Sequence, residues 1–170
     1  MERVASFEKV SFNQFKADYS KTIGESDDSV IKRVYDSIVL PVRATKGSAG
    51  YDFCSTVDFV LNPGETVNIP TGIRVKIEDG WVLSCYPRSG LGFKYRLQLN
   101  NTVGIIDSDY YYSDNEGHIF LKMTNCSNDG KTVSIKLGDR FAQGIFTPYG
   151  ITYSDNVDAE RNGGFGSTSN

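Results

Sequence analysis

The hydrophobic positions follow a helical period near the N-terminus of the chain. Three aromatic residues recur at helical spacing: Phe12, Phe15 and Tyr19. Ser11 followed by Gln14 has the form of a capping box at the start of that helix. The pattern returns after a polar stretch, at Val30, Ile31, Val34 and Tyr35. We therefore predict that residues 1–36 form a short, partly helical extension.

The period changes to two over residues 37–152, where short alternating runs are bounded by turn signals such as Asp79-Gly80. The residues predicted to face inward are Ile73, Val75, Ile77, Ile119, Leu121, Met123, Val133, Ile135 and Leu137. Many short strands without intervening helical patterns indicate an antiparallel sandwich or barrel. We predict an all-β domain for this part of the chain.

Residues 153–170 are polar and rich in glycine. A segment of this kind cannot bury enough apolar surface to fold alone, so we expect a mobile C-terminal arm. Phe165 is an unusual residue in such a tail. Its presence indicates an arm that becomes ordered when something is bound.

The charge and the cysteine content exclude several classes of protein. The chain has 170 residues and a net charge of −3, which argues against a general nucleic-acid binder. No apolar run reaches the roughly 18 residues of a membrane span, and the first residues carry no signal-peptide core. Three widely spaced cysteines and a single histidine, His118, argue against a zinc site and a disulfide framework. We expect buried free thiols and a cytoplasmic location.

Two segments carry groups that suit a metal ion or an anion. In residues 47–52, small side chains permit close backbone approach, and Asp52 offers a carboxylate to a hydrated metal ion. Further along, the Arg88 guanidinium, the Ser89 hydroxyl and the backbone N–H groups near Gly90 can cradle phosphate oxygens. Taken alone, each segment is also an ordinary polar turn.

Residues 101–110 form an apolar run that delivers Asp107 at its end. The spacing of Asp107 and Asp109 predicts that both carboxylates lie on one strand face. A carboxylate in this place can orient a water molecule as a general base. The simpler interpretation is a strand that ends in an acidic turn.

Two further segments contain polar groups with two interpretations each. Arg140 and Gln143 are candidate side chains of a site, or Arg140 forms a structural ion pair with Asp139. In the tail, Phe165 could stack on a base. The groups of the tail that suit a terminal phosphate are Arg161, Gly166, Ser167 and Thr168. The alternative for the tail is a flexible end without function.

Together, and in this order on an all-β chain, the five segments resemble the five motifs of the homotrimeric dUTPase family, the deoxyuridine triphosphate nucleotidohydrolases. The resemblance covers about residues 38–170, and residues 40–52 look like the first strand and first motif of the family. It implies a distorted β jelly roll that assembles as a homotrimer, each active site being built from three chains. It also implies hydrolysis of dUTP to dUMP and diphosphate, which limits uracil incorporation into DNA and supplies dUMP for dTMP synthesis.

The resemblance implies catalytic roles for a few residues. Asp107 would hold the 3′-hydroxyl and activate the attacking water. Gln143 would help to place the α-phosphate or the water. Asp52 would support Mg²⁺ through its water shell. Tyr110 would lie against the deoxyribose and leave no space for a 2′-hydroxyl.

The resemblance also implies which residues bind the rest of the nucleotide. Uracil would be read by Asn101 and by the backbone around it, including Gly104 and Ile106. The phosphates would be contacted by Arg88, Ser89 and Gly90, and from the tail by Arg161, Gly166, Ser167 and Thr168. Phe165 would close over uracil.

The chain departs from the family pattern in three places. Arg161 lies four residues before Phe165, where five is usual in the family. Residues 111–118 look like a small insertion, at whose end His118 is expected to be structural. Residues 1–36 have no counterpart in the minimal family form, and they could pack on a neighbouring subunit or recruit an unknown protein partner.

Two other functions remain open on the same kind of fold. A deoxycytidine triphosphate deaminase would need a glutamate at C4 of the base, and Glu116 is the one plausible candidate near the nucleotide motifs. A binding or regulatory protein would have lost its catalytic groups, whereas every candidate polar position here holds a competent residue type.

Overall fold

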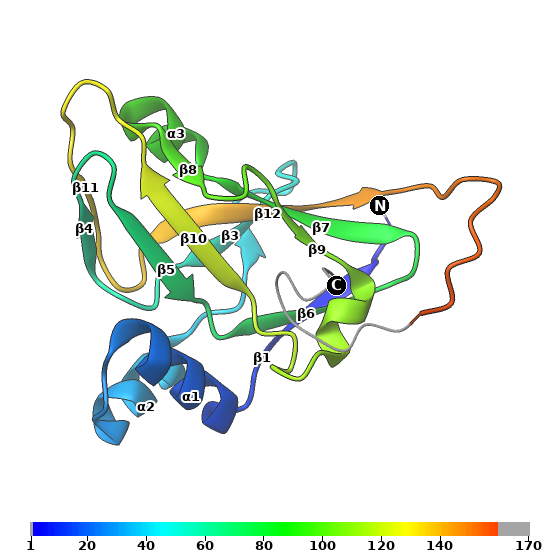
Figure 1. The fold of residues 1–170 in the computed structure, drawn as a ribbon, viewed down its shortest axis with the longest axis horizontal. Helices are drawn as coiled ribbons and strands as arrows, with labels where there is room; N and C mark the ends of the chain where they lie inside the picture. Colours follow the sequence, from blue (N-terminus) through cyan, green and yellow to red (C-terminus); the bar gives the residue numbers. More distant parts are fainter. Residues whose placement is uncertain (1, 160–170) are drawn as a thin grey trace.

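The computed structural model describes residues 2–159, in which strands form the body and a helical pair lies against one side (Figure 1). The strands are β1 Ala5–Lys9, β2 Val42–Arg43, β3 Tyr51–Cys54, β4 Phe59–Leu61, β5 Thr66–Pro70, β6 Ile73–Ile77, β7 Trp81–Pro87, β8 Leu97–Leu99, β9 Gly104–Ile106, β10 Phe120–Asn125, β11 Val133–Ile135 and β12 Arg140–Pro148. The helices are α1 Phe12–Ile23, α2 Asp28–Ser37, α3 Ser89–Tyr95 and the 3₁₀ helix η1 Ser108–Tyr112. No helix in this part of the chain combines the length and the hydrophobicity that a bilayer crossing requires.

The described strands pair into four antiparallel sheets. The largest has the order β2-β3-β12-β7-β9, and a three-stranded sheet has the order β5-β10-β8. The two small sheets are β1-β6 and β11-β4. Side chains from both larger sheets meet in one core, among them Phe53, Leu83, Leu97, Leu121 and Phe141. This arrangement confirms the prediction of an all-β, jelly-roll-like domain.

The alternating runs of the sequence form strands, or continue into them, with one buried face. The positions that are buried as predicted are Ile73, Val75, Ile77, Ile119, Leu121, Met123, Val133 and Ile135. The prediction for Leu137 is wrong, because β11 ends at Ile135 and Leu137 is exposed. The carboxylates of Asp58 and Asp139 accept hydrogen bonds from the backbone N–H groups of Leu137 and Lys136. These two bonds stabilise a turn that ends the strand.

The N-terminal extension contains the two predicted helices and a strand that was not predicted. The Ser11 hydroxyl caps α1 by accepting a hydrogen bond from the backbone N–H of Gln14. Ahead of the helices, β1 pairs with β6, and its Ala5 lies opposite Ile77. Phe7 is the one large apolar side chain of β1, so no alternating hydrophobic run marks this strand. Part of the extension therefore belongs to a sheet of the β domain.

A second apolar cluster joins the helical pair to the sheets. Its buried members are Val10, Phe15, Tyr19, Ile31 and Val34. Gly72 has a φ of +71°, and a Cβ on it would lie 2.3 Å from Cδ1 of Ile38 and 3.2 Å from the Phe15 ring. Glycine at this position therefore supplies the backbone conformation and the space that the docked helices need.

Strand β12 leads out of the body at the C-terminal side. It ends at Pro148, and residues 149–159 form neither helix nor strand but loop out beyond the sheets and then turn back (Figure 1). Exposed apolar side chains in this stretch are Tyr149, Ile151, Tyr153 and Val157.

Candidate active site

Three charged side chains meet at one end of the five-stranded sheet. Asp52 on β3 forms ion pairs with Arg88 (Nε to Oδ1, 3.1 Å) and with Arg140 (Nη1 to Oδ2, 3.2 Å). The Asp52 side chain is 8% exposed, whereas those of Arg88 and Arg140 are 42% and 45% exposed. One carboxylate thus neutralises one of two guanidinium charges. The remaining positive charge and the exposed N–H groups suit a bound anion.

Gln143 lies beside this cluster because it is directly opposite Asp52 in the β3–β12 ladder. Its amide Nε2 donates to the carbonyl of Pro87 at 3.4 Å. A Cβ on Gly50 would lie 2.5 Å from Oε1 of Gln143, so a side chain at position 50 would displace this amide. The sheet register therefore brings together the candidate segments that contain Asp52, Arg88 and Gln143.

Arg140 reaches Asp52 because β12 is irregular at its start. The register of β12 against β3 shifts between Arg140 and Ala142, and the neighbours Phe141 and Ala142 are both buried. A bulge inserts one extra residue, and this lets two consecutive side chains face the core. The alternative ion pair with Asp139 is wrong. A signal was present in the sequence, since two adjacent apolar residues stand between polar ones.

Ser89 and Gly90 begin α3 immediately after Arg88, and both are exposed. Arg88 is the residue that precedes the first turn of this helix and has an extended backbone. The predicted phosphate-binding residues therefore form one continuous exposed step next to Asp52.

The turn between β8 and β9 borders a cleft of about 650 Å³. Asn101 lies in this turn, and its carbonyl accepts a hydrogen bond from the backbone N–H of Val103 at 2.7 Å. Gly104 is opposite Cys85 on β7, and a Cβ on it would lie 3.2 Å from the Cys85 Cβ. The lining includes Asn101, Gly104, Ile106, Asn115, Phe120 and Lys122. Apolar walls with a few polar groups are typical of a pocket for a small organic ligand.

Asp107 stands between β9 and η1 and is half-buried, whereas Asp109 lies within η1 and is exposed. The prediction that both carboxylates share a strand face is wrong. Residues Ser108–Tyr112 form a 3₁₀ helix, which has three residues per turn, so side chains two positions apart point in different directions. Asp107 is thus set apart from Asp109 by the local backbone.

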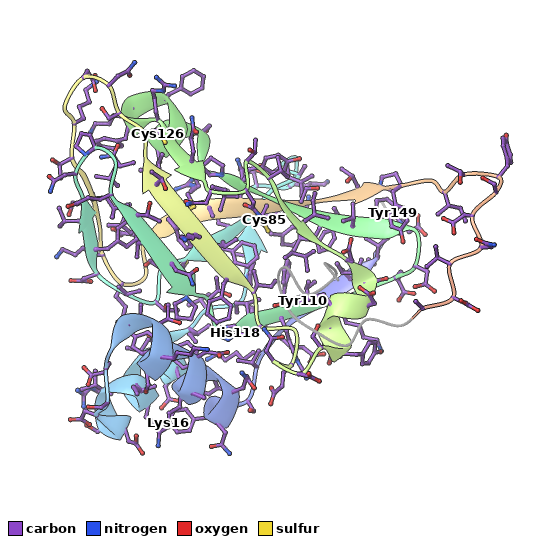
Figure 2. All side chains as sticks on the ribbon, in the orientation of Figure 1. Lys16, Cys85, Tyr110, His118, Cys126 and Tyr149 are labelled. Atoms are coloured by element: carbon purple, nitrogen blue, oxygen red, sulfur yellow. The ribbon has the colours of Figure 1, made fainter. Side chains whose placement is uncertain are left out.

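Tyr110 is almost fully buried in the main core. Its hydroxyl donates to the carbonyl of His118 at 2.7 Å and accepts a hydrogen bond from Nδ2 of Asn115 at 2.9 Å. Tyr110 is therefore held by the inserted residues 111–118, and Figure 2 shows it near His118. Asn115 connects it to the cleft.

His118 and Glu116 make structural contacts with the N-terminal extension. His118 is fully buried; its Nε2 accepts from the backbone N–H of Gly72 at 2.8 Å, and its Nδ1 lies 2.6 Å from Oδ2 of Asp18. Both carboxylate oxygens of Glu116 accept from Ser11, one from its backbone N–H and one from its hydroxyl, each at 2.7 Å. These contacts agree with the structural role expected for His118. They also disfavour Glu116 as a deaminase residue.

The cysteines are free thiols, but they are not all buried. Cys85 is buried, and this raises the pKa of its thiol to about 12. Cys54 and Cys126 are half-buried, so the expectation of buried thiols is wrong for these two. Among residues 2–159, no group of three or more His, Cys, Asp or Glu side chains is arranged to hold a metal ion.

The two halves of the candidate site lie far apart on one chain. In the antiparallel β7–β9 pair, Ile106 is opposite Leu83, so Asp107, the next residue, follows β9 toward the Trp81 end of β7. Arg88 lies at the other end of β7. At about 3.3 Å per residue, the two are separated by roughly 20 Å. Asp107 of one chain therefore cannot act on an anion bound at Arg88 of the same chain.

The predicted tail contacts fall outside the described residues. They are Arg161, Phe165, Gly166, Ser167 and Thr168. Their roles, and the shortened spacing between Arg161 and Phe165, stay predictions.

Solved structures similar to this chain include dUTPases. The chain aligns with the dUTPase of Streptococcus mutans at 32% identity and a TM-score of 0.62, over 86% of this chain and 98% of that one. It aligns with the dUTPase of Staphylococcus bacteriophage 80alpha, in a structure with dUPNHPP, at 23% identity and a TM-score of 0.63, over 99% of each chain. The fold is that of the dUTPase class.

Sequence comparison identifies the family. A family model described as dUTPase matches residues 36–169. A Lactococcus lactis deoxyuridine 5′-triphosphate nucleotidohydrolase is 45% identical over 134 residues, 77% of this chain and 88% of the relative. Its counterpart in Hahella chejuensis is 41% identical over 145 residues, 81% of this chain and 91% of the relative. The chain therefore belongs to the dUTPase family, the dUTP diphosphatases, and is an enzyme of nucleotide metabolism.

Proposed function

We propose that the protein hydrolyses dUTP to dUMP and diphosphate by in-line attack of water on the α-phosphorus. The observation that carries this proposal is the cluster of Asp52, Arg88 and Arg140 in a chain of the dUTPase family. A buried carboxylate orients two half-exposed guanidinium groups toward solvent. Their excess positive charge and fixed donors suit a triphosphate, which carries several negative charges.

The phosphate chain is bound at the end of the five-stranded sheet. Arg88 and Arg140 donate to phosphate oxygens through the N–H groups that Asp52 does not use. The Ser89 hydroxyl and the backbone N–H of Gly90 add two donors from the exposed start of α3. Gln143, whose amide is held by the Pro87 carbonyl, places the α-phosphate or the attacking water. Fixed donors of this kind lower the barrier because they need no reorganisation during the reaction.

The residues present fit a magnesium ion that is held indirectly. Both oxygens of Asp52 are paired with guanidinium groups, so the carboxylate suits contact with the ion's water shell and not direct coordination. Mg²⁺ commonly keeps several waters and takes its other ligands from substrate phosphates. When bound, the ion would neutralise charge on the triphosphate and on the leaving diphosphate. The dUTPase of S. aureus phage phi11 coordinates a structural Mg(II) ion.

Asp107 activates the water. Its carboxylate orients the water molecule and accepts a proton from it as the new bond to the α-phosphorus forms. The bond between the α-phosphorus and the bridging oxygen breaks, and that oxygen leaves on diphosphate. General-base assistance of this kind contributes about 10²- to 10⁴-fold. No covalent intermediate forms on the protein.

The cleft beside the β8–β9 turn binds the nucleoside. Asn101 and the backbone near Gly104 and Ile106 hydrogen-bond to the uracil edge. Tyr110 lies against the deoxyribose and excludes a 2′-hydroxyl. The tail, with Phe165, closes over the base. The support for this placement is the cleft itself, whose lining includes Asn101, Gly104 and Ile106.

The active enzyme is a homotrimer with shared sites. The separation of roughly 20 Å between Asp107 and Arg88 on one chain supports this, because one copy must bring its Asp107 to the arginines of another. The exposed apolar stretch of residues 149–157 is suited to contact a neighbouring copy. We also expect a cytoplasmic location and no direct binding of nucleic acid.

Diphosphate release from dUTP, dCTP, dTTP and UTP, each with Mg²⁺ and with EDTA, tests the proposal. We expect fast release from dUTP alone, dependent on Mg²⁺. Ammonia release from dCTP would instead support the deaminase. Binding of dUTP without release from any nucleotide would indicate a binding protein that has kept the site without its chemistry.

A further inference from the structure

The inserted residues 111–118 are bound to the N-terminal extension at three separate points. The first is at Tyr111, whose hydroxyl donates to Oε2 of Glu8 on β1 at 2.8 Å. The same oxygen pairs with Arg74 on β6 at 2.8 Å, and the Arg74 guanidinium lies 4.4 Å from the centre of the Tyr111 ring. The hydrogen bond from Tyr111 and the charge of Arg74 hold the pKa of Glu8 below its usual range despite partial desolvation.

The second point joins the start of α1 to the far end of the insertion. Glu116 accepts from the backbone N–H and the hydroxyl of Ser11. In a capping box, the side chain of the third helical residue accepts a hydrogen bond from the backbone N–H of the capping residue. Here Glu116, 105 positions away in the sequence, accepts that hydrogen bond from Ser11. Glu116 itself has a φ of +57°, which is unusual for a residue with a side chain. Next to it, a Cβ on Gly117 would lie 2.8 Å from the Tyr111 Cα, so the insertion is folded tightly onto itself.

The third point is the buried contact between Asp18 and His118. His118 Nε2 accepts from the backbone N–H of Gly72, so the ring proton lies on Nδ1 and is donated to Asp18 at 2.6 Å. Burial opposes ionisation of Asp18, but hydrogen bonds from His118 and Gln14 outweigh it and lower the pKa of the carboxyl. Figure 2 shows His118 where the helical pair meets the β domain.

The insertion in turn holds Asn115, which lines the nucleoside cleft, and Tyr110, whose hydroxyl is bonded to Asn115. The proton of the Tyr110 hydroxyl is used on the His118 carbonyl, so the group of Asn115 that faces this hydroxyl must be its NH₂. That orientation leaves Oδ1 of Asn115 as a buried acceptor without a hydrogen-bond partner among the described residues. Asn115 also lines the cleft. A buried acceptor beside a ligand cleft is suited to a donor on the ligand.

We propose that the N-terminal extension positions the sugar-facing wall of the nucleoside cleft. Glu8, Ser11 and Asp18 act as positioning residues: they hold residues 111–118, which hold Tyr110 and Asn115. Asn115 Oδ1 accepts a hydrogen bond from the bound nucleoside. The inference rests on the proposed function for the identity of the substrate, and it gives the extension and the insertion one joint task.

Five variants separate positioning from simple support of the fold. Asp18→Ala and Glu116→Ala each remove an acceptor at one contact point. Asp18→Asn keeps an acceptor for His118, and Glu116→Gln keeps an acceptor for the backbone N–H of Ser11, so both serve as conservative partners. Lys16→Ala is the matched control: Lys16 lies on α1 and pairs with Asp28 of α2, on the outer side of the helical pair (Figure 2).

For each variant we would measure kcat and KM for dUTP, the ratio of kcat/KM for dUTP and UTP, the dissociation constant of a non-hydrolysable dUTP analogue, and the melting temperature. We expect the two alanine variants to raise KM and the analogue dissociation constant about tenfold, as the loss of a charge-assisted hydrogen bond implies. Discrimination against UTP should fall, whereas kcat should change less than about threefold. The conservative variants and Lys16→Ala should resemble the wild type.

A lower melting temperature in the alanine variants with unchanged KM, unchanged analogue binding and unchanged UTP discrimination would overturn the inference, since it would show support of the fold alone. Failure of the proposed function has a different signature, namely a wild-type protein that releases no diphosphate from dUTP. Analogue binding still decides the positioning role in that case: equal dissociation constants across all variants would refute it.

Discussion

The phosphate side and the nucleoside side of the candidate site are fixed in different ways. Asp52, Arg140 and Gln143 stand on strands, and Arg88 directly follows one, so ladder register and a single bulge bring them together. The nucleoside side combines residues of β9 and β10 with the turn at Asn101, the 3₁₀ helix η1 and the inserted residues 111–118. Its shape depends on contacts with Glu8, Ser11 and Asp18, which are about 100 residues away in the sequence.

This difference shows where the chain can vary. A cluster set by sheet register tolerates little change, because moving one strand by one residue reverses every side chain. A wall held by side-chain contacts from another segment can be altered by changing that segment. The extension and the insertion of this chain fit together as one such pair.

The largest effect is expected on the nucleoside side, from Asp107→Asn. The amide cannot accept a proton from water, so turnover should fall by about 10³-fold, while binding of a non-hydrolysable analogue changes little. Asp109→Asn, two residues further in η1, is the matched control and should keep most of the activity. Equal losses in both variants, or a loss in Asp109→Asn alone, would show that Asp107 is not the base.

Phe15→Ala should loosen the nucleoside side by weakening the apolar cluster that joins the helical pair to the sheets. Phe15 of α1 is fully buried against Gly72, and removing a buried aromatic ring costs about 3–5 kcal/mol. Hydrogen exchange followed by mass spectrometry should show faster exchange in residues 107–118 than in β3 and β12. Phe12→Ala, on the same helix but half-buried, should have a smaller effect. Equally faster hydrogen exchange on the nucleoside side and on the phosphate side would mean that the extension supports the whole domain equally.

Arg140→Ala should affect the phosphate side alone. It removes one of the two guanidinium groups at Asp52, and kcat/KM for dUTP should fall about 10- to 100-fold. The melting temperature should change little, because the Arg140 side chain is half-exposed and the buried Asp52 keeps its ion pair with Arg88. Lys94→Ala, an exposed cation on the nearby α3, is the control. An equal loss with Lys94→Ala would point to general charge attraction and not to a fixed contact.

Acid should weaken the nucleoside side by a smaller amount. The pKa of Asp18 is lowered in the folded protein, so its contribution to stability is present above the ordinary carboxyl value of 3.8 and is lost as the pH falls through the lowered value. The wild type should therefore lose stability more steeply than Asp18→Asn below about pH 4. An equal loss of stability in the two proteins across this pH range would contradict the contribution assigned to Asp18.

Much of the β fold could be predicted from the sequence, because alternation marks each strand that has one apolar face. β1 could not, since its pairing with β6 is decided by tertiary contacts and Phe7 alone marks it. The exposure of Leu137 depends on carboxylates that end the strand. These misses share a cause: long-range partners override the local pattern.

The candidate site was predicted motif by motif, but not its internal geometry. Strand periodicity put Asp107 and Asp109 on one face, because a 3₁₀ turn has no signature in so short a run. The adjacent apolar residues Phe141 and Ala142 indicate two core positions in a row, but the pairing of Arg140 with Asp52 depends on the bulge in β12. Nothing in the local sequence of Glu116 or His118 indicates their partners Ser11 and Asp18, which are set by the docking of α1.

The most direct test of a site shared between copies is to mix two impaired variants. Arg88→Ala weakens the phosphate side and Asp107→Asn lacks the water-activating group, so each alone should turn over dUTP much more slowly than the wild type. After the two are unfolded and refolded together, random assembly should give about one quarter of the sites an intact Arg88 from one copy and an intact Asp107 from another. We predict that diphosphate release returns in the mixture. A mixture no more active than the two variants measured separately would contradict a site assembled from more than one chain.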